Sequence, residues 1–159
     1  MANAISEPIQ TVVLDPAASD TVWAALYLRI SNDFAGPEKD FNRQKTLGLE
    51  QLKVAGATHV DIYCDNDRSA SRYNLKPREG YLELLRQIEA GKYQIIAVRM
   101  EDRLHRQGIE LATFLQTCEQ AGVTRFVSGM GEFNLADPGQ RTTLYFKAAL
   151  AEAEWGEKP

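Results

Sequence analysis

The chain has 159 residues, 44% of them hydrophobic and 25% charged, a composition typical of a single soluble globular domain. No apolar run approaches the roughly 20 residues of a membrane-spanning helix, so we expect no membrane partner. The net charge of −4 argues against a protein that coats nucleic acid through its overall charge, and any contact with DNA requires a local cluster of arginines.

The first 22 residues show no clear periodicity, and we predict that they form a flexible leader. A short apolar strand is predicted next, at 24–31. Because side chains alternate along a strand, Tyr27, Arg29 and Ser31 share one face while apolar residues occupy the other. An arginine and a serine near the end of a strand are unusual in a core and typical of a functional site.

Strands then alternate with helices of about a dozen residues, after a polar loop at 32–41 and with a glycine-containing loop before the last helix. The predicted elements are strands at 59–64, 94–100 and 125–128, helices at about 42–55, 78–90, 109–121 and 141–154, and one short extended piece within the leader at 11–14. This alternation indicates parallel β-α-β units. We therefore predict a three-layer α/β fold, with a mostly parallel sheet of four or five strands and helices on both faces.

The cysteines and histidines predict no metal site. Cys64 lies in a strand-like run and Cys118 in a helix-like run, which indicates free, buried, reduced thiols and a cytoplasmic protein. The two histidines, His59 and His105, lie far from each other and from the cysteines, so the spacing of a zinc site is missing. We expect neither a metal nor another cofactor.

Three segments carry polar residues that suit chemistry, and each follows a predicted strand, where an open α/β sheet places its ligand. They contain Arg29 with Ser31, Ser69 with Arg78, and Asp102 with Arg103 and Arg106. A hydroxyl among guanidinium groups suits attack on a phosphodiester without a metal, because arginine holds phosphate oxygens in a bidentate manner. For each residue alone an ordinary strand or surface position is the better interpretation, but their joint placement favours a site.

Other chemistries fit the sequence less well. Ser31, His105 and Asp102 are the residue types of a hydrolase triad, but the G-x-S-x-G turn that exposes such a serine is missing. The stretch Asp65-Asn66-Asp67 is similar to the D-x-D motif of phosphatases without the residues expected next, and as a calcium loop it lacks the glycine and the closing glutamate. The glycines near residue 130 do not follow a nucleotide-binding pattern.

Five motifs occur in one order along residues 24–154. They are Tyr27-Leu28-Arg29-Ile30-Ser31, Arg43-Gln44, Asp67-Arg68-Ser69-Ala70 followed by Arg78-Glu79-Gly80-Tyr81, Asp102-Arg103-Leu104 with Arg106, and Pro138-Gly139-Gln140-Arg141 with Ala151-Glu152-Ala153-Glu154. This series resembles the serine recombinases, which include resolvases, invertases and large serine integrases. The long spacing before Arg78 is more similar to the large integrases.

The resemblance implies a catalytic domain at 23–154 in which Ser31 attacks a DNA phosphate and forms a 5′-phosphoserine bond. Arg29, Arg78, Arg103 and Arg106 would hold the phosphate, Asp102 would orient Arg103 or assist proton transfer, and Gln44 and Ser69 would support the site through hydrogen bonds. DNA would be the partner, and the full-length protein would form a homodimer or tetramer.

The end of the sequence departs from the family pattern. The family's last helix normally continues for several turns and leads to DNA-binding domains, whereas Gly156 and Pro159 predict that the helix stops before a tail at 155–159. The resemblance therefore leaves two functions open. The chain is either a catalytic domain that is inactive in recombination by itself, or a truncated, non-catalytic fragment that acts as a dimerisation or interaction module.

Overall fold

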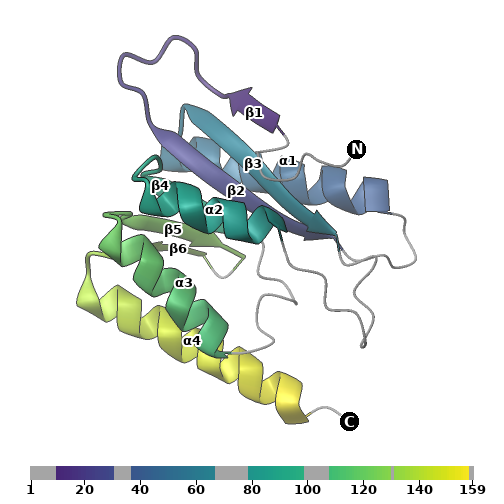
Figure 1. Cartoon of the computed structure of the whole chain (residues 1–159), viewed down its shortest axis with the longest axis vertical. Coiled ribbons are helices and arrows are strands. Elements are labelled where there is room, and N and C mark those ends of the chain that lie inside the picture. The colour runs from purple at the N-terminus through teal and green to yellow at the C-terminus, as the bar shows by residue number, and fades with distance from the viewer. Residues whose placement is uncertain (1–9, 31–36, 67–78, 99–107, 130, 158–159) are drawn as a thin grey trace.

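A computed structural model describes residues 10–30, 37–66, 79–98, 108–129 and 131–157 (Figure 1). Strands and helices alternate along these residues. In order they are β1 (Gln10–Val13), β2 (Trp23–Ile30), α1 (Pro37–Ala55), β3 (His59–Asn66), α2 (Glu79–Glu89), β4 (Ile95–Val98), α3 (Gly108–Gln120), β5 (Arg125–Ser128), β6 (Gly131–Asn134) and α4 (Pro138–Glu157). None of the helices among the described residues has the length and apolar character needed to cross a membrane.

The strands form one sheet in the order β1-β3-β2-β4-β5-β6. The central pairs β3–β2, β2–β4 and β4–β5 are parallel, whereas β1 and β6 pair antiparallel at the two edges. The predicted fold class, a mostly parallel α/β sheet, is confirmed. The predicted number of four or five strands is wrong, because the two short edge strands bring the described sheet to six.

Helices cover both faces of the sheet, as predicted: α1 lies on one face, and α2, α3 and α4 lie on the other (Figure 1). Strand β2 divides its side chains between two hydrophobic clusters. Leu26 and Leu28 pack in the cluster beneath α1, while Ala25 and Tyr27 pack in the cluster beneath α2 and α3. Alternation along the strand therefore puts Arg29 on the face of Tyr27, toward α2.

Helices α1 and α4 both begin earlier than predicted, and each begins with a proline. A proline suits the first helical position because its missing N–H would have no partner there. In α1 the earlier start brings Phe41 against the cluster beneath the helix. In α4 the carboxylate of Asp137 accepts a hydrogen bond from the Gly139 N–H at 2.9 Å, which caps the first turn. The predicted loops at 32–41 and before residue 141 are therefore wrong where these turns form.

The extended piece predicted at 11–14 is confirmed. Residues 10–13 form β1 beside β3, where the Leu14 N–H donates to the Thr58 carbonyl at 2.7 Å. At the other end, α4 runs through Gly156 to Glu157, so the predicted stop before residue 155 is wrong. A glycine inside a helix costs only about 1 kcal/mol, too little to end it.

Glycines in the left-handed conformation follow two of the helices. Gly56 and Gly91 follow α1 and α2 with φ angles of 100° and 83°, a conformation that glycine adopts without the strain a Cβ would cause. At the end of α1 the Ala57 N–H donates to the Leu52 carbonyl at 3.0 Å. This bond closes the last turn of α1, and the chain continues from there into β3.

Candidate active site at the carboxyl edge of the sheet

The parallel strands β2, β3 and β4 end at the same edge of the sheet. Ile30 at the end of β2 is paired with Asn66 at the end of β3, and Tyr27 of β2 is paired with Val98 at the end of β4. The strand before Ser31 is thereby the neighbour of the strand before Asp102. Ser31 directly follows Ile30, so its segment leaves the sheet at this edge.

The two other candidate segments start at the same edge. The segment with Ser69 and Arg78 follows Asn66, and the segment with Asp102, Arg103 and Arg106 follows Val98. All of these residues and Ser31 lie outside the described residues, so the convergence of their side chains stays a prediction. The structure describes the ends of β2, β3 and β4, after which the three segments begin.

Two predicted site residues, Arg29 and Gln44, are among the described residues near this edge. Arg29 is partly buried one residue before the end of β2, and its backbone carbonyl accepts a hydrogen bond from Gln44 Nε2 at 3.3 Å. Gln44 lies on α1, which packs under the opposite face of the sheet. This bond ties the helix after the Ser31 segment to the strand before it.

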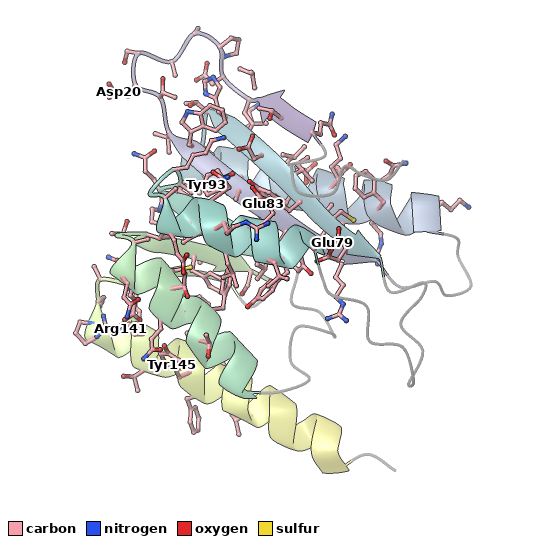
Figure 2. All side chains as sticks on the ribbon, in the orientation of Figure 1. Asp20, Glu79, Glu83, Tyr93, Arg141 and Tyr145 are labelled. Carbon is pink, nitrogen blue, oxygen red and sulfur yellow. The ribbon has the colours of Figure 1, made fainter. Side chains whose placement is uncertain are left out.

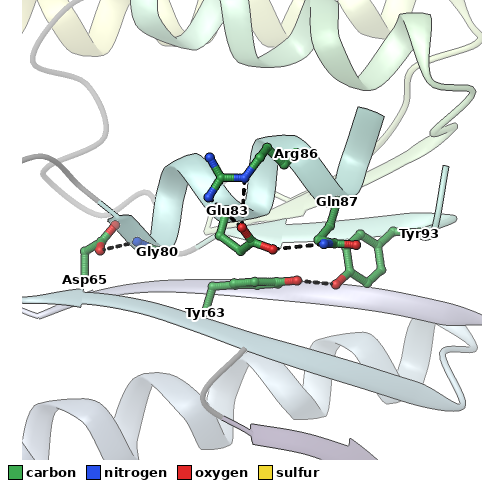
Figure 3. Close-up of polar contacts among 7 residues, drawn as sticks. All are labelled: Tyr63, Asp65, Gly80, Glu83, Arg86, Gln87 and Tyr93. Carbon is green, nitrogen blue, oxygen red and sulfur yellow. Dashed lines mark hydrogen bonds and ion pairs between the residues drawn. The ribbon is translucent and has the colours of Figure 1, made fainter. Parts of the chain in front are cut away.

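Asp65 accepts three hydrogen bonds at this edge, and it lies opposite Arg29 in the register of β2 and β3. Its Oδ1 accepts a hydrogen bond from the Gly80 N–H at 2.7 Å (Figure 3). Its Oδ2 accepts from the Tyr81 N–H at 2.8 Å and from the Tyr27 hydroxyl at 2.7 Å. The carboxylate thus satisfies two of the N–H groups that the first turn of a helix leaves without a helical partner.

The glycine of the Arg78-Glu79-Gly80 motif has a steric reason at this contact. A Cβ on Gly80 would lie 2.8 Å from the Cys64 carbonyl oxygen and 2.9 Å from Asp65 Oδ1, closer than van der Waals contact allows. The start of α2 therefore approaches the end of β3 at a distance that only glycine permits. Next to it, the Tyr27 and Tyr81 rings meet edge to face with their centroids 5.7 Å apart.

The structural role of Asp65 did not follow from the sequence. The strand was predicted to end at Cys64, which left Asp65 in a polar loop, whereas β3 runs to Asn66. A carboxylate at the end of a strand, followed by a glycine in the first turn of the next helix, is the signal that points to this contact. Tyr27 was predicted only as a member of the first motif. Its hydrogen bond to Asp65 was missed because Asp65 was assigned to a loop.

Helix α2 carries its own polar network beyond this contact. Glu83 is buried on the sheet side of α2 and accepts hydrogen bonds from Gln87 Nε2 at 2.9 Å and from Arg86 Nη2 at 2.6 Å (Figure 3). The bond from Gln87 and the charge of Arg86 hold the pKa of Glu83 below its usual value despite burial. The glutamate therefore stays ionised within the helix that begins at the candidate site.

A second buried carboxylate, Asp61, lies toward the other end of β3. It accepts hydrogen bonds from Thr11 Oγ1 of β1 and from the Tyr93 hydroxyl, both at 2.7 Å, and pairs with Lys92 Nζ at 2.7 Å. Burial by itself raises the pKa of Asp61, but the bonds from Lys92, Thr11 and Tyr93 outweigh it and lower the pKa. Figure 2 shows Tyr93 beyond the end of α2 opposite to Glu79, so this network lies away from the candidate site.

The described residues contain no group of three histidine, cysteine, aspartate or glutamate side chains that could hold a metal ion. Both cysteines are free, as predicted, although Cys64 is only half-buried. Cys118 is fully buried in the cluster beneath α2 and α3, and burial raises the pKa of its thiol to about 12. It therefore remains a protonated core residue.

Comparisons with known proteins agree with this architecture. A family model described as "Resolvase, N terminal domain" matches residues 24–156. The chain is similar in structure to the N-terminal catalytic domain of TP901-1 integrase, with a TM-score of 0.56 and 20% identity over 86% of this chain and 99% of that one. It is also similar to a resolvase family site-specific recombinase from Streptococcus pneumoniae, with a TM-score of 0.53 and 18% identity over 84% and 89% of the two chains. No curated protein matches the chain.

Proposed function

The chain belongs to the family of resolvase N-terminal domains, and on this ground we propose that it cleaves and rejoins DNA strands in site-specific recombination through Ser31. The observation that carries the proposal is the common edge of the sheet. Parallel pairing of β2 with β3 and β4 starts the Ser31 segment and both arginine segments from one place. Such an edge is where open α/β sheets bind their ligands.

The proposed reaction exchanges one phosphodiester for another. Ser31 Oγ attacks the phosphorus of a DNA phosphodiester, a P–Oγ bond forms, and the bond from phosphorus to the 3′ oxygen breaks. The hydroxyl proton passes in net terms to the 3′ oxygen, which leaves as a free 3′-OH, while the 5′ side stays attached as phosphoserine. Rejoining is the reverse attack by a 3′-OH. Because the number of ester bonds is unchanged, the exchange needs no nucleotide cofactor.

Arginines supply the charge in this proposal. Arg29, Arg78, Arg103 and Arg106 bind the phosphate oxygens and stabilise the charge of the transition state, because guanidinium groups match phosphate geometry in a bidentate manner. Asp102 orients Arg103 or assists the proton transfer. Gln44, whose side chain holds the Arg29 carbonyl, fixes the end of β2, and Ser69 adds a hydrogen bond from the loop after β3.

DNA is the proposed partner, and a homodimer or tetramer is the proposed state of the full-length recombinase. One observation supports contact between copies, which both the proposed function and the alternative, a dimerisation module without catalysis, require. Helix α4 exposes 62% of Phe146 and 49% of Leu150, which lie one helical turn apart and form an apolar stripe on the surface. Such a stripe suits contact with a second copy, with or without a working active site.

The proposal is tested by trapping the covalent intermediate on nicked DNA duplexes of randomised sequence, from which the cleaved end cannot be rejoined. The parent chain is expected to form a protein–DNA adduct that Ser31→Ala abolishes. Ser128→Ala is the matched control, because Ser128 ends the parallel strand β5 of the same sheet, and this variant should keep the adduct. Chelators should leave the adduct unchanged, since guanidinium groups supply the charge. An adduct that survives Ser31→Ala, or that is lost on chelation, overturns the proposal.

A further inference from the structure

Strand β1 lies before the part of the chain that the family model matches. The match begins at residue 24, whereas β1 spans Gln10–Val13 and is joined to β2 by residues 14–22. Without β1, β3 would be an edge strand of the described sheet, and β1 covers that edge by pairing antiparallel with residues 59–62. The chain thus adds a strand to the sheet from outside the family domain.

Few contacts hold β1 in place. Thr11 Oγ1 donates a hydrogen bond to Asp61 Oδ1, and just after the strand the Leu14 N–H donates to the Thr58 carbonyl, both at 2.7 Å. Three of the four residues of β1 are exposed, and of the strand only Val12 packs, half-buried, against the cluster beneath α1. A strand that buries so little apolar surface opens at a lower free energy than the strands of the core.

The rest of the sheet keeps its contacts when β1 opens. Asp61 is the buried carboxylate of β3 that accepts the bond from Thr11, and it also accepts from the Tyr93 hydroxyl and pairs with Lys92 Nζ, both at 2.7 Å. These two partners follow α2 and do not move with β1. Strand β3 stays paired with β2 along residues 59–66. Opening therefore costs the bonds of β1 itself and leaves no buried charge without a partner.

The link between β1 and β2 begins and ends at one residue, Thr58. The Leu14 N–H donates to the Thr58 carbonyl at 2.7 Å, and the Val22 N–H donates to the Thr58 hydroxyl at 2.8 Å. Most residues between these two points are exposed, and Asp15 forms a local turn by accepting from the Ala17 N–H at 3.1 Å. A link with such local contacts can extend without unpacking the core.

We propose that β1 exchanges between copies of this chain, so that it leaves its own β3 and pairs with the β3 of a second copy. A second copy is the partner because its β3 offers the same register, with Asp61 opposite Thr11, and every bond lost on opening forms again. The exchange is reciprocal, which gives a closed, symmetric dimer.

This contact is separate from the exposed apolar stripe of α4. Strand β1 forms one edge of the sheet, whereas α4 packs beside β6 at the opposite edge (Figure 1). Two copies can therefore meet through β1 without using α4. The inference goes beyond the proposed function and does not depend on the chemistry of Ser31.

Crosslinking of mixed chains tests the exchange directly. Val13 is 49% exposed and lies opposite His59 in the register, so Val13→Cys and His59→Cys put one thiol on each strand. Both substitutions are made separately in the full chain with Cys64→Ser, since the remaining Cys118 is fully buried. After incubation of the two chains together at high concentration, a short bismaleimide should join them as a heterodimer. A chain that carries both substitutions should become crosslinked internally at low concentration.

Val54→Cys is the matched control for chance encounters, because Val54 is 88% exposed on α1 and lies outside both strands. Its mixture with His59→Cys measures the background of random crosslinks, which the mixture of Val13→Cys with His59→Cys should exceed. A yield of heterodimer no higher than this background would overturn the inference. Absence of the internal crosslink in the chain with both substitutions would overturn it as well.

Thr11→Val tests whether the bond to Asp61 limits the exchange. The substitution removes the hydroxyl and keeps the shape of the side chain, so heterodimer should form faster by roughly tenfold, the effect of losing a hydrogen bond to a charged group. Thr117→Val is the control, because it removes a hydroxyl that donates at 3.0 Å within α3, and it should leave the rate unchanged. No acceleration by Thr11→Val, or equal acceleration by both, would overturn the inference.

Hydrogen exchange of the dilute parent chain tests the opening step. The Leu14 amide should exchange well before the amides of β2, because β1 opens while β2 stays paired on both sides. A Leu14 amide that is protected as long as those of β2 would show that β1 opens only when the domain unfolds, and it would overturn the inference. None of these measurements involves DNA, so each outcome leaves the proposed function standing.

Discussion

Two carboxylates on β3, Asp61 and Asp65, lie four residues apart and have different partners. A lysine and two hydroxyl groups surround Asp61, whereas the first turn of α2 and one tyrosine hydroxyl surround Asp65. Both are acceptors whose partners come from other elements of the chain. Asp61 thereby links β1 and the residues after α2 to the sheet, while Asp65 links α2 to the edge where the candidate site lies.

The first prediction concerns the stability that Asp61 contributes. Its pKa is lower in the folded chain than its ordinary value of 3.8, so its contribution is fully present above that value and is lost as the pH falls through the folded pKa. Asp61→Asn should lower the free energy of unfolding by about 2 kcal/mol at neutral pH, and the difference should shrink below about pH 4. Urea unfolding across the pH range measures it, and a difference that grows with acid would contradict this account.

The second prediction compares two glycines, each at the second position of its helix. Gly80→Ala should cost about 1 to 3 kcal/mol, because its Cβ would lie 2.8 Å from a backbone carbonyl of β3. Gly139→Ala of α4 should change stability by less than about 0.5 kcal/mol, since its Cβ would lie 3.4 Å from the Asp137 side chain and meet nothing closer. Denaturant unfolding of both variants checks this, and equal costs would show that the close approach at Gly80 is not what requires glycine.

At the scale of single residues, the strand face of a side chain could be predicted from alternation along the strand. Contacts between distant segments could not be predicted. The face shared by Tyr27 and Arg29 follows from the period of a strand and agrees with the clusters observed. The role of Asp65 depends on a helix that starts 14 residues later returning to the end of its own strand. The residues next to Asp65 in the sequence do not indicate that the start of α2 packs against the end of β3.

At the scale of elements, α4 presents a surface that its own fold leaves uncovered. Phe146 and Leu150 are both about half exposed or more, whereas Leu144 on the same helix is buried against the sheet side. We predict that Phe146→Gln with Leu150→Gln weakens self-association and leaves the melting temperature nearly unchanged, because these side chains lose little contact within the monomer. Sedimentation velocity of parent and variant measures this. Unchanged association would exclude this stripe as the contact between copies.

Elements with a strong apolar period were predicted to within about two residues, as α2 and α3 illustrate. The errors lie where capping, not periodicity, decides the boundary. Pro37 and Pro138 each look like a loop residue in a sequence and stand at the first position of a helix in the structure. Strand β6 was missed because Phe133 is its only buried residue, too little for an alternating pattern, and pairing with β5 stabilises it.

At the scale of the whole molecule, the charge of the chain constrains how it meets DNA. With a net charge of −4, attraction to phosphate has to come from the arginines that we propose for the candidate site. We predict weak binding without sequence preference, and an affinity that falls by about 10²-fold between about 50 and 200 mM salt if roughly four phosphate contacts form. Fluorescence anisotropy with labelled duplexes of unrelated sequence measures both. Tight binding to one sequence would contradict the prediction.

The fold as a whole was predicted more completely than the site. Alternating strands and helices determine the parallel core of the sheet, and the order of the three candidate segments follows from it. An extended piece at 11–14 was predicted, but its pairing with β3 and the edge strand β6 depend on contacts between segments and did not follow from local pattern. The meeting of Ser31 with Arg78 and Arg103 depends on segments beyond the described residues and stays a prediction.

The most direct test of the central claim is to identify the bond between this chain and cleaved DNA. Duplexes labelled at one end or the other show which DNA end becomes attached, and mass spectrometry of the digested adduct identifies the attached residue. We predict a 5′-phosphate linked to Ser31 and a free 3′-OH on the other end of the break. Attachment through Tyr27 or any other residue, or attachment to the 3′ end, would contradict the claim.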